Sequence, residues 1–340
     1  MKRFVLSLAA VVVAGAALAS CAHRVGPRPG QLSLGMVTDV GGLGDRSFND
    51  SAYRGLLRAR RELGAYIQVL QSHSAADYQP NLLALTAGHF DMIYAIGFLM
   101  QHDLQQVAAD HPSQHYAIVD AVVDEPNVVS VTFREEDGSF LAGALAAMMS
   151  PRHHIAFLGG EDVPLIHKFE AGYIAGAREI DPTIRVDVKY VGSFDDVAAG
   201  KELANLLFDG GATIVYAAAG KAGLGAIDAV RTRPGAYVIG VDSDQDGIAP
   251  GKVLTSMVKH VDVAVFDVAE ALKDGHPLRG HIVLGLKDDG VGLTDFRYTR
   301  AAIGPARLAR LAALRRAIMD GRIVPPSTLE ALRAFRPVAI

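Results

Sequence analysis

Two successive series of alternating strand-like and helix-like segments constrain the fold of this 340-residue chain more than any other feature. In the first series, short apolar runs predict strands at residues 32–38, 66–71, 92–97, 116–119 and 128–133. In the second series, strands are expected at residues 155–158, 185–190, 214–217 and 236–241. Strands that alternate with helices form βαβ units, which build parallel sheets covered by helices. The sequence therefore predicts an α/β protein with two doubly wound lobes of about four or five strands each.

The segments between these strands have helical spacing. Helices are expected at residues 52–63, 78–88, 139–149, 167–180, 197–209 and 223–230. Half of all residues are hydrophobic, a composition that suits a well-packed α/β protein. The chain has 33 Lys and Arg against 37 Asp and Glu and no long basic run, which argues against a nucleic acid partner.

Polar, glycine and aromatic residues follow the carboxyl ends of strands in both series. They include Asp39, Gly97, Asp120, Gly220 and Asp242. Ligands of doubly wound sheets bind outside these strand ends. An aspartate after a strand can equally cap a helix, and a glycine there can equally form a turn. Only their joint occurrence predicts a cleft shared by two lobes.

The segment after the first strand, "VGGLGDRSFND", contains a solitary aromatic residue in a polar setting. Phe48 stands beside Asn49 and among several carboxylates. Because the chain has no tryptophan, any flat stacking surface must come from Phe, Tyr or His. We therefore single out Phe48 and Asn49 as candidate ligand contacts at the mouth of this strand.

The first residues have the pattern of a lipoprotein signal. Lys2 and Arg3 precede an apolar run at residues 4–19, which is too short for an ordinary transmembrane helix. The run ends in the letters LASC, where small residues precede Cys21, the only cysteine of the chain. The alternative is an ordinary signal peptide with a coincidental cysteine.

This pattern predicts that residues 1–20 are a signal peptide and that Cys21 is acylated, for example with palmitate. The acyl chains would anchor the protein to the extracytoplasmic side of a cell membrane. Residues 21–30 would then be the lipidated cysteine and a tether, since this stretch contains two Pro and two Gly and no apolar periodicity. Whether that membrane would be an inner or an outer one stays open.

Motifs of enzyme chemistry are missing from the sequence. It has neither the dinucleotide-binding spacing G-x-G-x-x-G nor the phosphate-binding spacing G-x-x-x-x-G-K-[ST]. It also lacks the nucleophile motif G-x-S-x-G and a His or Cys cluster at metal-ligand spacing. The acidic run at residues 135–137 is better explained by the start of a helix, where carboxylates interact favourably with the positive end of the helix dipole. We therefore expect a binding protein that needs no cofactor or metal.

Seven segments, in order, resemble the basic membrane lipoprotein family, the substrate-binding proteins of nucleoside transporters. The opening motif is "TDVGGLGDRSFNDSAYRG", and "VSVTFREEDGSFLAGALAAMMS" and "IAFLGGEDVPLIHKFEAGYIAGA" follow it. The other segments are "VIGVDSDQ", "VLTSMVKHVDVAVFD", "LGLKDDGVGL" and "AIMDGRIVPP". The resemblance covers roughly residues 32–330, nearly all of the chain after the tether.

The resemblance implies a type I periplasmic-binding-protein fold, in which two α/β lobes are joined by a three-stranded hinge. Lobe 1 is expected at residues 31–133 plus 260–290, and lobe 2 at residues 134–259 plus 291–340, with C-terminal helices that can pack across the hinge. The hinge crossings are expected near Phe133, Lys259 and Gly290. A monomer is the expected state, with an ABC permease and ATPase as partners.

The resemblance also implies a purine nucleoside as ligand. Phe48 and Phe169 would stack on the two faces of the base, and Asp120 and Asn49 would bind its edge. Asp242 and Lys259 would bind the ribose, Gly220 would let the backbone approach the sugar, and Asp39 would support the site. An ionised Asp120 would favour guanosine and inosine over adenosine, since adenine presents an acceptor at its N1. The polar pair His167-Lys168 departs from the family pattern and would lie at the rim.

Three alternatives stay open at this stage. The same fold could serve a ligand-sensing lipoprotein that is read by a membrane receptor. A nucleoside-cleaving enzyme would need a general acid or a metal cluster, which the sequence does not suggest. A sugar ligand would need more polar contacts than two flat phenylalanine rings provide.

Overall fold

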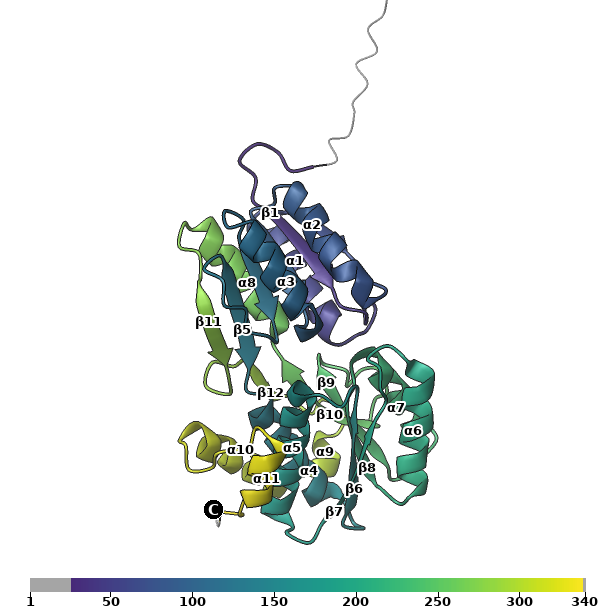
Figure 1. The fold of residues 1–340 in the computed structure, drawn as a ribbon. Helices are drawn as coiled ribbons and strands as arrows, with labels where there is room; N and C mark the ends of the chain where they lie inside the picture. Colours follow the sequence, from purple (N-terminus) through teal and green to yellow (C-terminus); the bar gives the residue numbers. More distant parts are fainter. Residues whose placement is uncertain (1–25, 339–340) are drawn as a thin grey trace, which may run out of the picture.

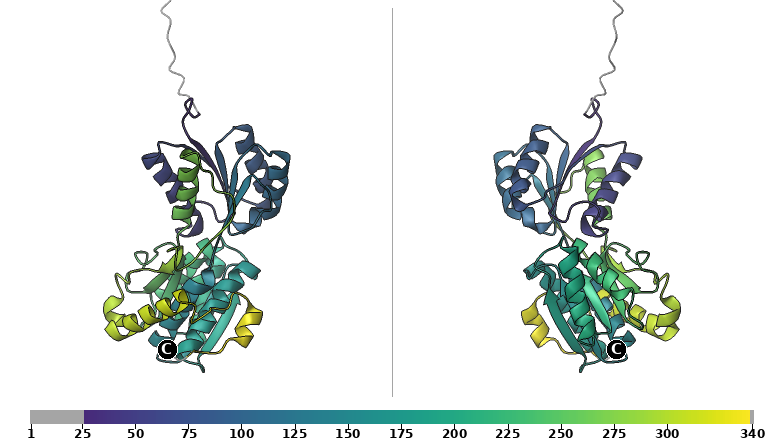
Figure 2. Two further views of the ribbon diagram at one scale, coloured as in Figure 1. Left: turned by 90° about the vertical axis from the view of Figure 1, so that its left-hand side faces the viewer. Right: turned by 90° about the vertical axis from the view of Figure 1, so that its right-hand side faces the viewer.

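The computed structural model describes residues 26–338, which form two lobes joined by a narrow waist (Figure 2). Each lobe is built on a sheet of six strands, with the strand orders β11-β5-β4-β3-β1-β2 and β12-β10-β9-β8-β6-β7. The expected signal peptide and Cys21 lie outside the described residues. In Figure 1 the first described residues are at the far end of lobe 1, and the last described residues lie on lobe 2.

Lobe 1 contains the first five strands and two elements that return to it late in the chain. Its strands are β1 (Ser33–Thr38), β2 (Tyr66–Leu70), β3 (Met92–Ile96), β4 (Tyr116–Val119), β5 (Val128–Phe133) and β11 (Gly280–Leu284). Its helices are α1 (Phe48–Glu62), α2 (Tyr78–Ala87), α3 (Gln101–Asp110) and α8 (Val261–Lys273), with the short 3-10 turns η1 (Ala75–Asp77) and η2 (Phe98–Met100).

Lobe 2 has the same arrangement. Its strands are β6 (His154–Gly159), β7 (Arg185–Tyr190), β8 (Ile214–Ala218), β9 (Tyr237–Asp242), β10 (Val253–Lys259) and β12 (Val291–Leu293). Its main helices are α4 (Glu135–Met149), α5 (Pro164–Ile180), α6 (Val197–Asp209) and α7 (Gly223–Val230), which follows the turn η3 (Gly220–Ala222). The remaining helices are α9 (Arg300–Ile303), α10 (Pro305–Met319) and α11 (Leu329–Ala334).

Burial explains the composition of the strands. Central strands such as β3 (MIYAI) and β8 (IVYAA) are buried along their whole length, because helices cover both faces of a parallel sheet. The edge strand β7 (RVDVKY) is partly exposed and alternates charged with apolar residues. Both sheets are parallel except for β12, which pairs with β10 in the antiparallel sense. The strands β10, β11 and β12 were not predicted from the apolar runs, so each sheet contains more strands than expected.

The chain passes between the lobes at three places. It leaves lobe 1 after β5, returns to it after β10, and leaves it again between β11 and β12. The helices α10 and α11 pack on α4 and α5 of lobe 2. From α10, Arg315 donates a hydrogen bond to the carbonyl oxygen of Leu286 in the third crossing. The last part of the chain therefore braces the connection between the lobes.

Three helices begin earlier than their apolar spacing predicted. The helices α1, α4 and α5 begin at Phe48, Glu135 and Pro164, about one turn before the predicted positions. The first turns of α1 and α4 are rich in polar residues and do not follow the hydrophobic period of the rest of the helix, and α5 begins at a proline, which is favoured at the first position of a helix.

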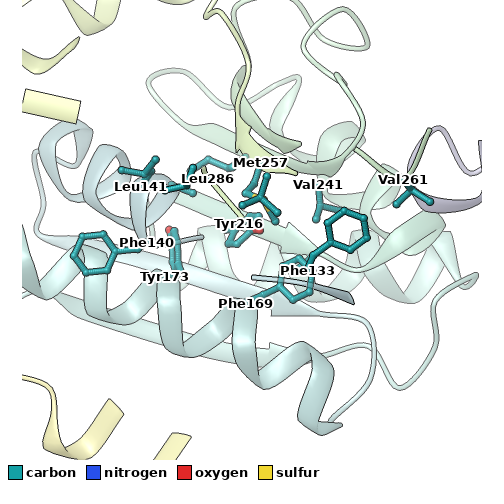
Figure 3. Packing of buried hydrophobic residues seen from close by; sticks show 14 of the residues in the cluster. Phe133, Phe140, Leu141, Phe169, Tyr173, Tyr216, Val241, Met257, Val261 and Leu286 are labelled. Atoms are coloured by element: carbon teal, nitrogen blue, oxygen red, sulfur yellow. The ribbon is translucent and has the colours of Figure 1, made fainter. Parts of the chain in front are cut away.

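The helices α4 and α5 cross at unusually short range on one face of the lobe 2 sheet. A Cβ atom on Gly143 would lie 1.9 Å from the carbonyl oxygen of Tyr173, and one on Gly176 would lie 1.9 Å from that of Phe140. Tyr173 also packs against Tyr216 on β8, with ring centroids 5.1 Å apart (Figure 3). Glycine is therefore required here by close packing of two backbones.

We expect Gly143→Ala to lower the free energy of unfolding by about 1–3 kcal/mol or more, because the added methyl group must force the two helices apart. Gly292→Ala is the matched control, since no atom lies within 4 Å of the Cβ that it would add. Urea denaturation measures both variants. Equal midpoints for the two would contradict the close crossing.

Candidate ligand-binding site

A cavity lies between the lobes at the carboxyl ends of their strands. Its empty volume, which includes the part open to solvent, is about 540 Å³. In each sheet the order of strands reverses next to the first strand, β1 or β6, and ligands bind at such points in doubly wound sheets. All eight residues singled out from the sequence line this cavity: Asp39, Phe48, Asn49, Asp120, Phe169, Gly220, Asp242 and Lys259.

The turn after β1 is held together by buried hydrogen bonds. The carboxylate of Asp39 accepts from Asn49 Nδ2 at 2.7 Å and from the backbone nitrogen of Gly41 at 2.9 Å. Gly97 follows β3 with a φ of +118°, and a Cβ atom there would lie 3.0 Å from Asp39 Oδ2. Asp39 therefore orients Asn49, and Gly97 leaves room for its carboxylate.

Asp45 fixes the start of α1. Its carboxylate accepts hydrogen bonds from the backbone nitrogens of Ser47, Asn49 and Asp50, at 2.7–3.0 Å. These donors belong to the first turn of the helix, where backbone N–H groups have no partner within the helix. This cap places Phe48 and Asn49 on the first turn of α1 with their side chains at the cavity.

Asp120 and Asp242 stand directly after β4 and at the end of β9, and both have a left-handed backbone, with φ of +70° and +62°. Such a conformation is uncommon for residues other than glycine, and it concentrates at functional sites. Asp242 Oδ2 accepts a hydrogen bond from Ser47 Oγ at 2.7 Å, which joins lobe 2 to lobe 1.

Lys259, the last residue of β10, brings a buried charge into the cavity. Its side chain is 2% exposed, and Nζ donates to Asp120 Oδ2 at 2.6 Å. Nζ also lies 4.8, 5.4 and 5.5 Å from the ring centroids of Phe48, Phe133 and Phe169. Carboxylates raise the pKa of Lys259 and outweigh the opposing effect of burial, so this side chain is a cation at neutral pH.

Burial raises the pKa of all three lobe 1 carboxyl groups that line the cavity, Asp39, Asp45 and Asp120. The pKa of Asp39 is raised to about 7, and its hydrogen bonds with Asn49 and Gly41 only partly oppose the effect of burial. Burial likewise raises the pKa of Asp120 to about 6, against the opposing charge of Lys259. Near neutral pH, Asp120 is therefore mainly a hydrogen-bond acceptor.

Two acceptor atoms in the cavity have open hydrogen-bonding capacity. Within residues 26–338, neither Asp120 Oδ1 nor Asn49 Oδ1 has a hydrogen-bond partner, although both are buried. Buried polar atoms are nearly always paired in native proteins. The cavity is thus suited to a flat ligand that presents N–H donors beside phenylalanine rings.

Sequence analysis missed an aromatic contact that closes one side of the cavity. Phe98 from lobe 1 and Phe194 from lobe 2 both line it, and their rings meet edge to face with centroids 6.2 Å apart. Phe98 follows β3 and was visible as a strand-end residue. Phe194 lies in the loop after β7, where no periodic pattern marks it.

The polar pair predicted at the rim is divided in the structure. His167 Nε2 lies 2.6 Å from Asp162 Oδ1 on the surface. Lys168 instead reaches inward, where Nζ donates to the carbonyl oxygen of Phe133 and to Glu135 Oε2, each at 2.5 Å. Lys168 therefore belongs to the connection between the lobes.

Neighbouring hydrogen bonds join the lobes beside the cavity. Ser243 Oγ donates to the carbonyl oxygen of Ser47 at 2.7 Å and accepts from Arg54 Nη2 at 3.0 Å. Gln245 Nε2 donates to the carbonyl oxygen of Arg46 at 3.1 Å. The start of α1 and the loop after β9 thus form a direct contact between lobes, and the structure is a closed form.

The family model and the relatives that match this chain all point to one protein family. A family model described as ABC transporter substrate-binding protein, PnrA-like, matches residues 32–309. The ABC transporter nucleoside-binding protein BmpA of Lactococcus lactis is 35% identical over 358 residues, covering 96% of this chain and 100% of the relative. An uncharacterized lipoprotein of Pyrococcus horikoshii is 36% identical over 279 residues, covering 78% of this chain and 69% of the relative.

Solved structures agree with the fold. An ABC transporter solute-binding protein from Aeropyrum pernix superimposes with a TM-score of 0.82 at 28% identity, covering 89% of this chain and 96% of that one. The dimeric Lac repressor, at a TM-score of 0.61 and 19% identity over 78% of this chain and 98% of its own, shares the fold alone. The predicted architecture of two doubly wound lobes is confirmed.

Two further findings concern residues 26–338. No helix in this range is long and apolar enough to cross a membrane. The same range contains no group of three or more His, Cys, Asp or Glu side chains placed to hold a metal ion.

The raised pKa of Asp39 predicts a specific dependence of stability on pH. Because the folded state binds this proton more tightly than the unfolded state, stability falls as pH rises from about 3.8 to about 7. Asp39→Asn removes the titrating group and keeps an oxygen that can accept from Gly41 and Asn49. The difference between the melting temperatures at pH 5 and pH 8 should therefore be smaller by a few degrees in the variant than in the wild type. Parallel curves for the two proteins would contradict this.

Proposed function

The chain belongs to the family of PnrA-like ABC transporter substrate-binding proteins, and on that premise we propose that it captures a purine nucleoside between its lobes. Guanosine and inosine are the favoured ligands, and an ABC importer with permease and ATPase subunits would receive them. The protein would be a monomer held extracytoplasmically by a lipid on Cys21. Relatives named as lipoproteins and as basic membrane proteins support a membrane-associated role of this kind.

The open acceptors of lobe 1 are the single observation that carries the choice of base. Asp120 Oδ1 and Asn49 Oδ1 are buried at the cavity without a partner in the described chain. Guanine presents N–H donors on the edge that carries N1 and N2, and hypoxanthine presents one at N1, whereas adenine has an acceptor at N1. A base without these N–H donors would leave the buried acceptors unpaired, and such unpaired groups give a site strong discrimination between ligands.

The other cavity residues suit the rest of a nucleoside. Phe48 and Phe169 supply flat apolar rings, and each stacked base contributes about 1–3 kcal/mol. Asp242 can accept from ribose hydroxyls and Lys259 can donate to them. Gly220, with a φ of +55°, brings backbone to the cavity without a side chain. Asp39 accepts a hydrogen bond from Asn49 Nδ2 and so orients this side chain.

Calorimetric titration of the purified full chain in detergent, after refolding to remove carried ligand, tests the proposal. The ligands are guanosine, inosine, adenosine, cytidine and ribose. We expect tight binding of guanosine and inosine, adenosine weaker by at least tenfold, and no binding of ribose. If the protein binds none of the nucleosides, the proposed ligand is wrong, and the sensing role with another small molecule is favoured.

Replacing Phe48 with alanine tests the stacking directly. Loss of one ring face should weaken guanosine binding by roughly 5- to 150-fold, the equivalent of 1–3 kcal/mol. Phe335→Ala is the matched control, because Phe335 is also half-buried but packs on Phe140, away from the cavity. Titration gives the affinity, and circular dichroism checks the fold. Unchanged affinity in the Phe48 variant would remove this ring from the site.

A further inference from the structure

A second carboxylate faces the ammonium group of Lys259 from outside the cavity lining. Glu135 is the first residue of α4 and is fully buried, and its Oε1 lies 3.6 Å from Lys259 Nζ. Within the described chain this Oε1 has no hydrogen-bond partner, whereas Oε2 accepts from Lys168. At 3.6 Å the ion pair with Lys259 is longer than a charge-assisted hydrogen bond, so Oε1 would gain a closer partner if the ammonium moved toward it.

The ammonium of Lys259 stands where the proposed ligand must bind. It donates to Asp120 Oδ2 and lies within 5.5 Å of the ring centroids of both Phe48 and Phe169. A base that stacks on either ring and pairs with the Asp120 carboxylate would meet this ammonium. A base edge with two N–H donors, such as N1 and N2 of guanine, can pair with both carboxylate oxygens, so it would take Oδ2 as well as the open Oδ1 and thereby require Lys259 to leave Asp120.

We propose that Glu135 is a positioning residue: it forms a close ion pair with the Lys259 ammonium when a ligand binds the Asp120 carboxylate. The inference rests on the proposed function, because a base edge is what competes for Asp120. A movement on the order of 1 Å would bring Nζ within charge-assisted hydrogen-bond distance of Glu135 Oε1. Lys168 holds the other oxygen of Glu135 and so keeps this carboxylate in place.

Charge balance favours this transfer over a simple loss of the ion pair. Without Glu135, a displaced ammonium would have only Asp242 nearby, at 3.9 Å from Nζ. Leaving one member of a buried ion pair without its partner is strongly unfavourable. With Glu135 present, the N–H donors of the ligand bind Asp120 and the displaced ammonium keeps a carboxylate partner. Glu135 and Lys259 also adjoin the first and second crossings, so the transfer takes place where the lobes join.

Glu135→Gln tests the transfer, with Glu136→Gln as the matched control. Glu136 is the next residue of α4, is also buried, and also approaches Lys168, at 3.6 Å, but has no described contact with Lys259. In calorimetry on the full chain in detergent, Glu135→Gln should weaken guanosine binding roughly tenfold, the size of a typical interaction between coupled residues. Glu136→Gln should stay within about twofold of the wild type.

A double-mutant cycle with Lys259→Met separates positioning from a merely structural role. Because Glu135 acts through Lys259, Glu135→Gln should change the affinity by less than about twofold in the Lys259→Met background. If Glu135→Gln does not fold, Glu135→Asp keeps the charge at a shorter reach and should lose affinity only in the presence of Lys259.

The outcomes distinguish this inference from the proposed function. A wild-type protein that binds no nucleoside overturns both. Guanosine binding by the wild type with equal affinity in both glutamine variants overturns the role of Glu135 and leaves the proposed function standing. An equal loss of affinity with and without Lys259 would show that Glu135 acts only through the fold.

Discussion

The ion pair between Lys259 and Asp120 is the interaction on which the rest of the site depends. It joins the end of a lobe 2 strand to the end of a lobe 1 strand, at 2.6 Å and almost wholly shielded from water. Buried charges are tolerated only when they are paired, so the surrounding residues must keep this pair satisfied. The left-handed backbone of Asp120, the phenylalanine rings and the neighbouring carboxylates all serve that requirement.

The first turn of α1 links this pair to the closure of the lobes. Asp45 caps the turn, and the same turn carries Phe48 and Asn49 into the cavity. One residue earlier, Ser47 binds Asp242 across the gap between the lobes. The proposed ligand contacts and the contact between the lobes therefore share one element, so a ligand held at this turn would also stabilise the contact that closes over it.

The sheets of the two lobes have the same topology where they border the cavity. Each sheet has its order reversal next to its first strand, and each contributes glycine and aspartate after strands at that edge. The close crossing of α4 and α5 sets the base of lobe 2, because glycine at Gly143 and Gly176 lets the backbones touch. Glu135, the first residue of α4, lies with its Oε1 3.6 Å from Lys259 Nζ.

The sequence by itself determined the class of fold and the strand-end candidates Asp39, Asp120, Gly220 and Asp242, because burial imposes periodicity and parallel strands end at one edge. Phe48 and Asn49 stood out by their polar setting, and Phe169 and Lys259 followed only from the resemblance to the family. All eight line one cavity, although their binding of a ligand stays a prediction. The early helix starts, the late strands β10 to β12, and the placement of Phe194 and Glu135 were decided only by the tertiary structure. Local patterns report which face of an element is buried. They carry no record of the hinge crossings, which set Glu135 beside Lys259 from a distant part of the chain.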